Sequence, residues 1–311
     1  MNKFKGFLFG MTASSTFGLL PLFTLPIMSE GLTTNSILCY RMLFASVLVA
    51  VLMQVRKITF RTNLRELLWF AFLGFFYYGS ASLLFQAYGT MSSGMATTLH
   101  FLYPVGVTLI MALVFKQRPS PFTILAIILG LSGVALLSLK EGGGSSSASL
   151  VGILLVLLSG LSYAAYLVTM NNVRRVRESN NLKLTLYVLI FSALFFLLDT
   201  SLSGGLQMIP SGRALTNLLL LAFLPTLVSN LALVRAVKSI GSTLTSVLGA
   251  MEPLTAIVIG VVVFGEEVTG PMALGILLIL LSVTIIVLSP LLDKNIADRL
   301  RRLSKRPIRR Q

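Results

Sequence analysis

The run STLTSVLGAMEPLTAIVIGVVVF (residues 242–264) is long enough to cross a lipid bilayer as a helix, yet it holds a carboxylate and a proline near its centre. A spanning helix needs about 20 mostly apolar residues. Glu252 is the only charged residue of this run, and burial of a charge in lipid is costly, so Glu252 is expected to face a cavity or a partner. Pro253 has no amide hydrogen to donate one turn earlier, which weakens the helix at the same place.

The whole chain shares the composition of this run. Of its 311 residues, 55% are hydrophobic and only 11% are charged, whereas a soluble domain carries about 25% charged residues. Nine further apolar runs accompany residues 242–264, and together they predict an all-α integral membrane protein with ten transmembrane helices. We expect these helices at residues 4–26, 35–55, 67–88, 92–115, 121–139, 150–171, 184–202, 214–234, 242–264 and 271–290.

The distribution of positive charge tests this count. The net charge is +15, but the cations lie in short clusters between apolar runs, which argues against nucleic acid as a partner. If the N-terminus is cytoplasmic, ten alternating spans leave 22 of the 25 Lys and Arg residues on the cytoplasmic side. Cytoplasmic loops of membrane proteins carry such an excess. The pattern therefore predicts a multi-pass protein of the bacterial inner membrane with both termini in the cytoplasm.

A Gly/Ser-rich segment divides the predicted spans into two sets of five. We expect two five-helix repeats, at residues 1–139 and 150–290, joined by a flexible periplasmic linker at residues 140–149. Residues 291–311 are expected to form a basic cytoplasmic tail that contacts membrane lipids. An alignment of residues 99–139 with residues 248–288 places Pro104 on Pro253. Because five is odd, the second repeat must be inverted in the membrane. Inverted repeats place a binding site at their interface near the bilayer midplane.

Polar and aromatic side chains within the spans are candidates for lining such a site. Tyr103 aligns with Glu252 between the repeats, and it shares a helix face with His100, the only histidine. The full set of expected cavity residues is His100, Tyr103, Glu252, Tyr163, Tyr166, Asn230, Tyr78, Gln86 and Phe17. Simple packing is the alternative for the aromatic side chains, and a hydrogen-bonded interior position is the alternative for His100.

Three residues are expected to act on structure or gating. Pro104 and Pro253 interrupt the backbone hydrogen bonds of their helices. Arg41 lies in the second span, where it could reach outward to lipid headgroups or pair with a carboxylate or with helix carbonyl groups. Direct contact between Arg41 and the cargo is the alternative. A stripe of small residues at four-residue intervals also predicts close packing of the first helix, namely Gly6, Gly10, Ser14 and Gly18.

Several of these residues occur in segments that resemble a known family. Glu252-Pro253-Leu254 followed by Phe264-Gly265-Glu266, the matching Tyr103-Pro104 of the first half, and Tyr40-Arg41-Met42 resemble the EamA-type ten-helix members of the drug/metabolite transporter superfamily. The resemblance covers nearly the whole chain. It implies a secondary carrier with a central cavity between two five-helix halves, in a family whose members export amino acids, other metabolites or drugs.

We therefore expect a secondary transporter that exports a small organic metabolite, such as an amino acid or drug, by alternating access, with proton coupling left open. One alternative is uptake or exchange of a phosphorylated or nucleotide-linked metabolite, and another is a membrane-embedded lipid-modifying enzyme. The sequence has no nucleophile elbow, zinc-protease or P-loop motif. With one His and one Cys it also offers few metal ligands. We expect no enzymatic activity, no cofactor and no metal site.

Overall fold

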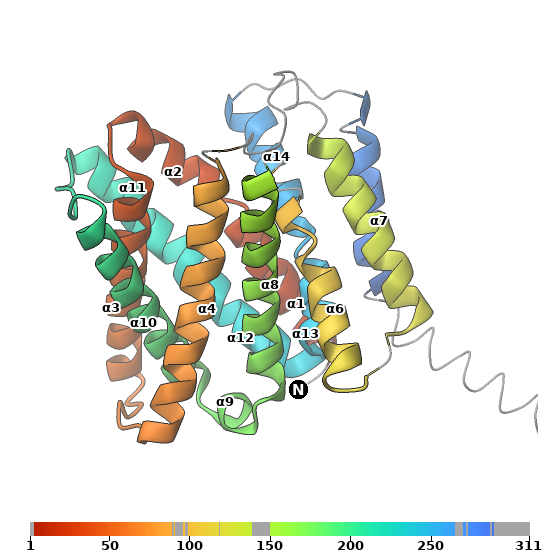
Figure 1. Ribbon diagram of the computed structural model, residues 1–311, viewed down its shortest axis with the longest axis horizontal. Coiled ribbons are helices and arrows are strands. Elements are labelled where there is room, and N and C mark those ends of the chain that lie inside the picture. Colours follow the sequence, from red (N-terminus) through yellow and green to blue (C-terminus); the bar gives the residue numbers. More distant parts are fainter. Residues whose placement is uncertain are drawn as a thin grey trace, which may run out of the picture.

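The computed structural model describes residues 3–88, 90, 96, 99–117, 119–138, 150–264, 270–271, 273–286 and 288. Throughout these residues the protein is a bundle of helices without strands (Figure 1). The labelled elements are α1 (Lys3–Phe17), α2 (Leu20–Ser29), α3 (Thr34–Val55), α4 (Leu64–Tyr88), α6 (Tyr103–Leu113), α7 (Pro121–Ser138), α8 (Leu150–Asn172), α9 (Arg174–Glu178), α10 (Asn181–Leu202), α11 (Gly212–Ala222), η1 (Phe223–Val228), α12 (Ser229–Ile240), α13 (Ser242–Leu248) and α14 (Met251–Phe264).

Within the described residues, six helical segments are long and apolar enough to cross a membrane. They are Lys3–Ser29, Thr34–Val55, Leu64–Ala87, Leu150–Asn172, Asn181–Leu202 and Gly212–Ile240. The other four predicted spans coincide with shorter apolar helices, namely Tyr103–Leu113, Pro121–Leu136, Ala273–Ile286 and α14. The all-helical membrane fold is confirmed, and the count of ten crossings stays a prediction.

The surface of the bundle suits lipid better than water. On α8, Leu154, Leu158 and Leu161 are each about half exposed, whereas Ser159 and Gly160 are buried. A helix of a soluble protein buries its leucines instead. Small and polar residues let membrane helices approach one another closely and bond across the interface, so this inverted pattern indicates that the leucines of α8 face the hydrocarbon.

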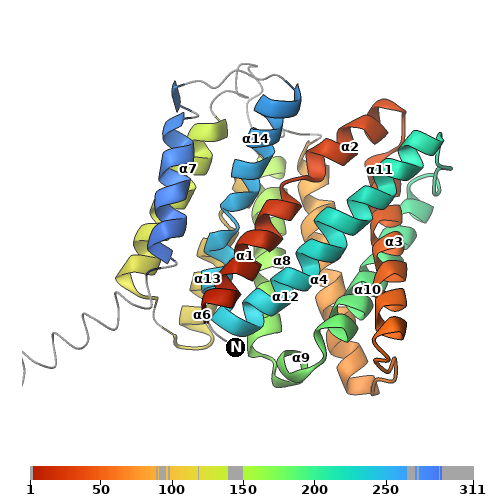
Figure 2. The same cartoon turned by 180° about the vertical axis from the view of Figure 1, so that it is seen from behind.

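The helices pair across the predicted linker. The most extensive contacts join α4 to α8, α3 to α10 and α1 to α12. Figure 1 shows α4 beside α8, and Figure 2 shows α1 crossing α12. Helices α1 and α4 belong to the first and third predicted spans, and α8 and α12 belong to the sixth and eighth. If the two sets of five spans are exchanged, the pair α1–α12 therefore becomes the pair α8–α4. The two predicted halves therefore interlock rather than forming separate bundles, while the repeat boundaries and the inversion remain predictions.

The small residues of α1 lie where it packs against the second half of the chain. A methyl group added at Gly6 would come within 2.6 Å of Ile240, and one at Gly10 within 2.5 Å of Leu248. At Gly18, just past the end of α1, an added Cβ would meet the backbone carbonyl oxygen of Glu252. The expectation of close packing along this stripe is confirmed at these three glycines.

One end of α3 is bonded to the connection between α10 and α11. Gln207 of this connection makes three hydrogen bonds: its side-chain oxygen accepts from the Thr33 amide at 2.6 Å, its carbonyl accepts from the Tyr40 hydroxyl at 2.7 Å, and its amide donates to Ser36 Oγ at 3.2 Å. This end of α3 is therefore fixed to the second half of the chain.

The opposite end of α3 is fixed to the second half as well. Lys183 at the start of α10 forms an ion pair with Glu66 at the start of α4, with 3.0 Å between Nζ and Oε2. Both side chains are mostly buried, and the Tyr187 hydroxyl donates to the Phe60 carbonyl at 2.6 Å nearby. Helices α3, α4 and α10 are thus tied together beyond both ends of α3, and we call these three helices the scaffold.

The predicted orientation can be tested by cysteine labelling, because Cys39 is the only cysteine and is buried. In spheroplasts, a membrane-impermeant maleimide should label Met208→Cys, which is 89% exposed between α10 and α11. Arg61→Cys and Ser304→Cys should react only after the membrane is permeabilised, because both positions are predicted to be cytoplasmic. Labelling of Arg61→Cys in intact spheroplasts would show that the orientation is wrong.

The α1 contacts predict a graded response to alanine. Gly18→Ala should destabilise the protein by about 1–3 kcal/mol, the usual cost of overpacking, because the added methyl meets rigid backbone. Gly10→Ala should cost less, because the end of the Leu248 side chain can move. Gly212→Ala has open space and should be neutral. The measurement is the midpoint of thermal unfolding in detergent, and equal midpoints for Gly18→Ala and Gly212→Ala would contradict the packing.

Candidate functional site

In the part of the chain that the structure describes, four helical paths are interrupted, and each has a proline at or just after the interruption. The first helix breaks between α1 and α2, which has a proline in its first turn. Helix α6 starts with Pro104 as its second residue. The π-helix η1, which joins α11 to α12, contains Pro225. The break between α13 and α14 is followed by Pro253. Proline removes a backbone donor and weakens the helix at each place.

Three of these interruptions touch one another. Gly18, in the break between α1 and α2, lies against the Glu252 carbonyl group in the first turn of α14. The hydroxyl group of Tyr103, at the start of α6, occupies the space that a side chain on Gly249 would need, in the break between α13 and α14. Irregular backbone at membrane depth is tolerated only where it is buried in protein or lines a cavity. These contacts locate such a region.

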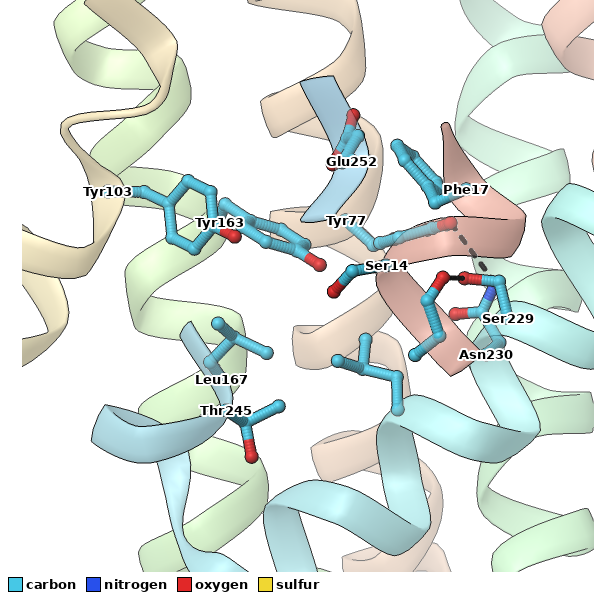
Figure 3. Close-up of a pocket in the computed structure, with 12 residues that line it drawn as sticks. Ser14, Phe17, Tyr77, Tyr103, Tyr163, Leu167, Ser229, Asn230, Thr245 and Glu252 are labelled. Carbon is cyan, nitrogen blue, oxygen red and sulfur yellow. Dashed lines mark hydrogen bonds between the residues drawn. The ribbon is translucent and has the colours of Figure 1, made fainter. Parts of the chain in front are cut away.

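A cavity lies at this point (Figure 3), and it holds about 390 Å³ of space not occupied by atoms, including space open to solvent. Its lining comes from both halves of the chain: Ala13, Ser14, Phe17, Tyr77, Tyr103, Tyr163, Leu167, Ser229, Asn230, Leu233, Thr245 and Glu252. Glu252 and Phe17 lie toward one end, and Leu167 and Thr245 toward the other (Figure 3). The cavity therefore brings an acid, an amide, hydroxyl groups and aromatic rings together.

The aromatic wall is built from tyrosines whose rings contact one another. The rings of Tyr103 and Tyr163 have centroids 4.8 Å apart and lie at 89° to each other. Such T-shaped pairs are a favoured aromatic geometry. Behind them, Tyr77 contacts Tyr166 at 5.3 Å between centroids, and Tyr166 is only 1% exposed. Tyr103, Tyr163 and Tyr77 thus border the cavity, whereas Tyr166 supports them from the second layer.

The polar groups on the facing wall are held by hydrogen bonds to neighbours. The Asn230 side-chain amide donates to the Tyr77 hydroxyl at 3.2 Å and to the Thr226 carbonyl at 2.8 Å. Ser229 Oγ donates to the Ala13 carbonyl at 2.8 Å and so joins α12 to α1. These bonds orient the amide oxygen of Asn230 and fix the wall on which it sits.

Glu252 carries the only acidic side chain among the described residues that line the cavity. No side chain in the described part of the chain forms a hydrogen bond or ion pair with its carboxylate. The nearest opposite charge that acts on it is Arg41, but the two groups do not come within salt-bridge distance. Intramembrane acids usually serve a pathway or a ligand, and this one is only partly buried, so it remains available to a molecule in the cavity.

Arg41 is anchored by the π-helix. Pro225 cannot donate to the carbonyl of Leu221, and the hydroxyl group of Thr226 donates to that carbonyl instead, at 2.8 Å. The same Thr226 oxygen accepts a hydrogen bond from Arg41 Nε at 2.6 Å. The guanidinium group also lies over the ring of Phe17, 5.2 Å from its centroid. Arg41 does not line the cavity itself, but it lies behind a residue that does.

His100 lies beside the cavity rather than in its lining. Its Nδ1 is 3.0 Å from Ser159 Oγ, and Ser159 Oγ donates its hydrogen to the Ser80 carbonyl at 2.5 Å. Because a hydroxyl group has one hydrogen to donate, Ser159 must accept from His100 and Nδ1 must carry a proton. The histidine is therefore part of a bonded link that joins α8 to α4.

The structure brings five of the nine expected cavity residues to the cavity: Phe17, Tyr103, Tyr163, Asn230 and Glu252. His100 and Tyr166 support the lining from behind. Two others lie away from it. Tyr78 packs on Phe195 and Phe196, and Gln86 donates to Ser82 Oγ at 3.1 Å. The functional role of each residue stays a prediction.

Seven lining residues were not expected from the sequence: the apolar Ala13, Leu167 and Leu233, and four that carry hydroxyl groups, namely Ser14, Tyr77, Ser229 and Thr245. Ser14 belongs to the small-residue stripe of α1, which predicted packing only. Tyr77 and Ser229 directly precede Tyr78 and Asn230. A chain position one residue away is turned by about 100° on a helix, so the sequence located the right turn of α4 but the wrong face.

The described residues contain no group of three or more His, Cys, Asp or Glu side chains that could hold a metal ion. The site offers hydroxyl, amide, carboxylate and aromatic groups, which bind organic molecules through hydrogen bonds, charge and stacking. A helical membrane protein with such a cavity at interrupted helices has an architecture found in membrane transporters.

Comparisons with known proteins agree with this class. Residues 4–139 and 150–288 both match the EamA-like transporter family. The chain belongs to this family. It is 26% identical over 239 residues to a protein of Synechocystis sp. described as an uncharacterized transporter, a match that covers 74% of this chain and 71% of that protein. One crystal structure of a protein matches with a TM-score of 0.79 over 94% of this chain and 98% of the other, at 19% identity, which shows the shared fold.

The link through Ser159 predicts a stability effect. Ser159→Ala removes the acceptor for His100 Nδ1 and the donor for the Ser80 carbonyl, and an unsatisfied buried group costs about 1–3 kcal/mol. The midpoint of thermal unfolding in detergent should fall. Ser201→Ala is the matched control, because Ser201 also donates to a helix carbonyl but is exposed. An equal shift for both variants would contradict the assigned link.

Proposed function

We propose that this protein is a carrier, not an enzyme, and that it exports a small organic metabolite across the bacterial inner membrane by alternating access. The observation that carries the proposal is the cavity between interrupted helices, with Glu252 at one end and tyrosines along its wall. In this conformation the space that a water-sized sphere can reach is about 20 Å³, which is roughly the room for one water molecule, so in our proposal the lining moves apart when cargo binds.

The packing of the bundle supports a division between fixed and moving parts. The scaffold of α3, α4 and α10 is tied at both ends by the Gln207 bonds and by the Lys183–Glu66 ion pair. The interrupted helices carry Phe17, Tyr103 and Glu252 to the cavity. Interruptions let the two halves of a helix tilt separately, and carriers use such elements as gates. In our proposal these helices open the cavity to one side at a time, while the scaffold stays together.

The charges at the cavity favour cargo that has an amino group. Glu252 is the one acid of the lining, and the described lining residues include no Lys or Arg. A phosphorylated or nucleotide-linked cargo would need several cations to replace its hydration. Neutral, zwitterionic or cationic metabolites, such as amino acids and amine-containing drugs, fit better. Glu252, rather than His100, is the group through which we propose proton coupling, because His100 does not line the cavity.

Transport in proteoliposomes tests the proposal. The purified protein should move radiolabelled amino acids or a cationic drug across the vesicle membrane, and Glu252→Gln should lower the rate at least tenfold because the cargo loses its charged partner. Glu178→Gln is the control, since Glu178 is exposed and pairs with Arg174 on the surface. If the wild-type protein moves no member of a broad amino-acid and drug panel, the proposed function fails.

A further inference from the structure

Arg41 has an unused hydrogen-bond donor in the interior of the bundle. The residue is only 3% exposed, and its Nε is occupied by Thr226 at 2.6 Å. Its Nη2 has no hydrogen-bond partner, one of three such buried side-chain atoms in the described residues. The others are serine hydroxyl groups. A charged donor without a partner is costly in a low-dielectric interior, so this position calls for an explanation.

Several residues near Arg41 also line the cavity. The guanidinium group lies over Phe17, which lines the cavity. The titratable groups close enough to act on its charge are Tyr77, Glu252 and Tyr163, and all three line the cavity. Thr226, which holds its Nε, also accepts the amide of Asn230 through its carbonyl. The ring of Phe17 is therefore the part of the cavity wall that lies against the arginine.

A simple structural role leaves this geometry unexplained. An arginine that only neutralised Glu252 would lie within salt-bridge distance of it, and it does not. If Arg41 served only to bond η1, its Nε would be sufficient, and the buried Nη2 without a partner would have no role. A guanidinium group presents its donors as a planar fork that matches a carboxylate. With Nε held by Thr226, the remaining donors have a fixed direction and an acceptor is missing.

We propose that Arg41 binds a carboxylate group of the cargo, after the ring of Phe17 has moved aside. Glu252, at the same end of the cavity as Phe17, binds the cationic group of the same molecule. The inference rests on the proposed function and narrows it: the preferred cargo carries a carboxylate as well as an amino group. Phe17 acts as a positioning residue that covers the arginine when the cavity is empty.

Matched acid and amide probes test the inference with the full-length protein. Alanine, leucine and phenylalanine are each compared with their carboxamides, which keep the amino group and side chain but lose the negative charge. The concentration that gives half of the maximal thermal stabilisation in detergent is measured for each probe. Transport of the same probes is followed in proteoliposomes. Wild-type protein should bind at least one acid tenfold or more tightly than its amide.

Three variants assign that preference. Arg41→Gln should weaken acid binding to the level of the amide and leave amide binding within twofold, and Arg41→Lys should keep part of the preference because it keeps the charge. Arg235→Gln is the matched control, because Arg235 lies over Phe9 at 5.4 Å in a similar cation–ring contact away from the lining. It should leave both affinities unchanged.

Two results would overturn the inference while leaving the proposed function in place. In the first, wild-type protein moves the probes but binds acid and amide equally. In the second, Arg41→Gln weakens acid and amide alike, as a purely structural arginine would. The wild-type comparison needs no variant, so it decides even if Arg41→Gln fails to fold. If wild-type protein neither binds nor moves any probe while a broad drug panel is also inert, the proposed function fails together with the inference.

Discussion

The constraint on which the structure depends is that backbone polar groups inside a membrane must find partners within the protein. In the described part of the chain, prolines remove backbone donors at four helical paths. At η1 the repair is visible: the hydroxyl group of Thr226 replaces the donor that Pro225 lacks, by bonding the Leu221 carbonyl. The same oxygen then accepts from Arg41. The repair of a backbone defect therefore also positions a buried charge.

Lipid cannot satisfy broken backbone, and three of the four interruptions lie against one another at the cavity. Gly18 packs on the backbone carbonyl group of Glu252, and Gly249 packs on the side-chain hydroxyl group of Tyr103, so the two halves approach closely at these glycines. Such tight packing resists gradual deformation. On the proposed function, a change of shape at this junction would be a switch between two packings, and the scaffold tied at Gln207 and Lys183 would stay fixed.

The sequence predicts the fold well because hydrophobic length and positive charge act along the chain, one span at a time. It predicts Glu252 and Tyr103 for the same reason, since each stands next to a proline in an apolar run. It does not distinguish Tyr77 from Tyr78, because the face of α4 that meets the cavity depends on how α4 packs against distant helices. The sequence also does not predict the Ser159–His100 hydrogen bond, since the two residues are 59 positions apart in the chain.

Charge separation is the last consequence of this arrangement. Arg41 lies in the interior of the bundle and Glu252 lies at the cavity, and the two side chains are too far apart to form an ion pair. This separation leaves the cost of removing the two charges from water partly uncompensated. On the proposed function, a zwitterion between them would complete both pairs and leave the loaded site neutral. The cargo would then bind most tightly to the conformation in which it contacts both charges. Because a ligand shifts a conformational equilibrium only by its difference in affinity for the two states, this binding would drive the movement of the gates.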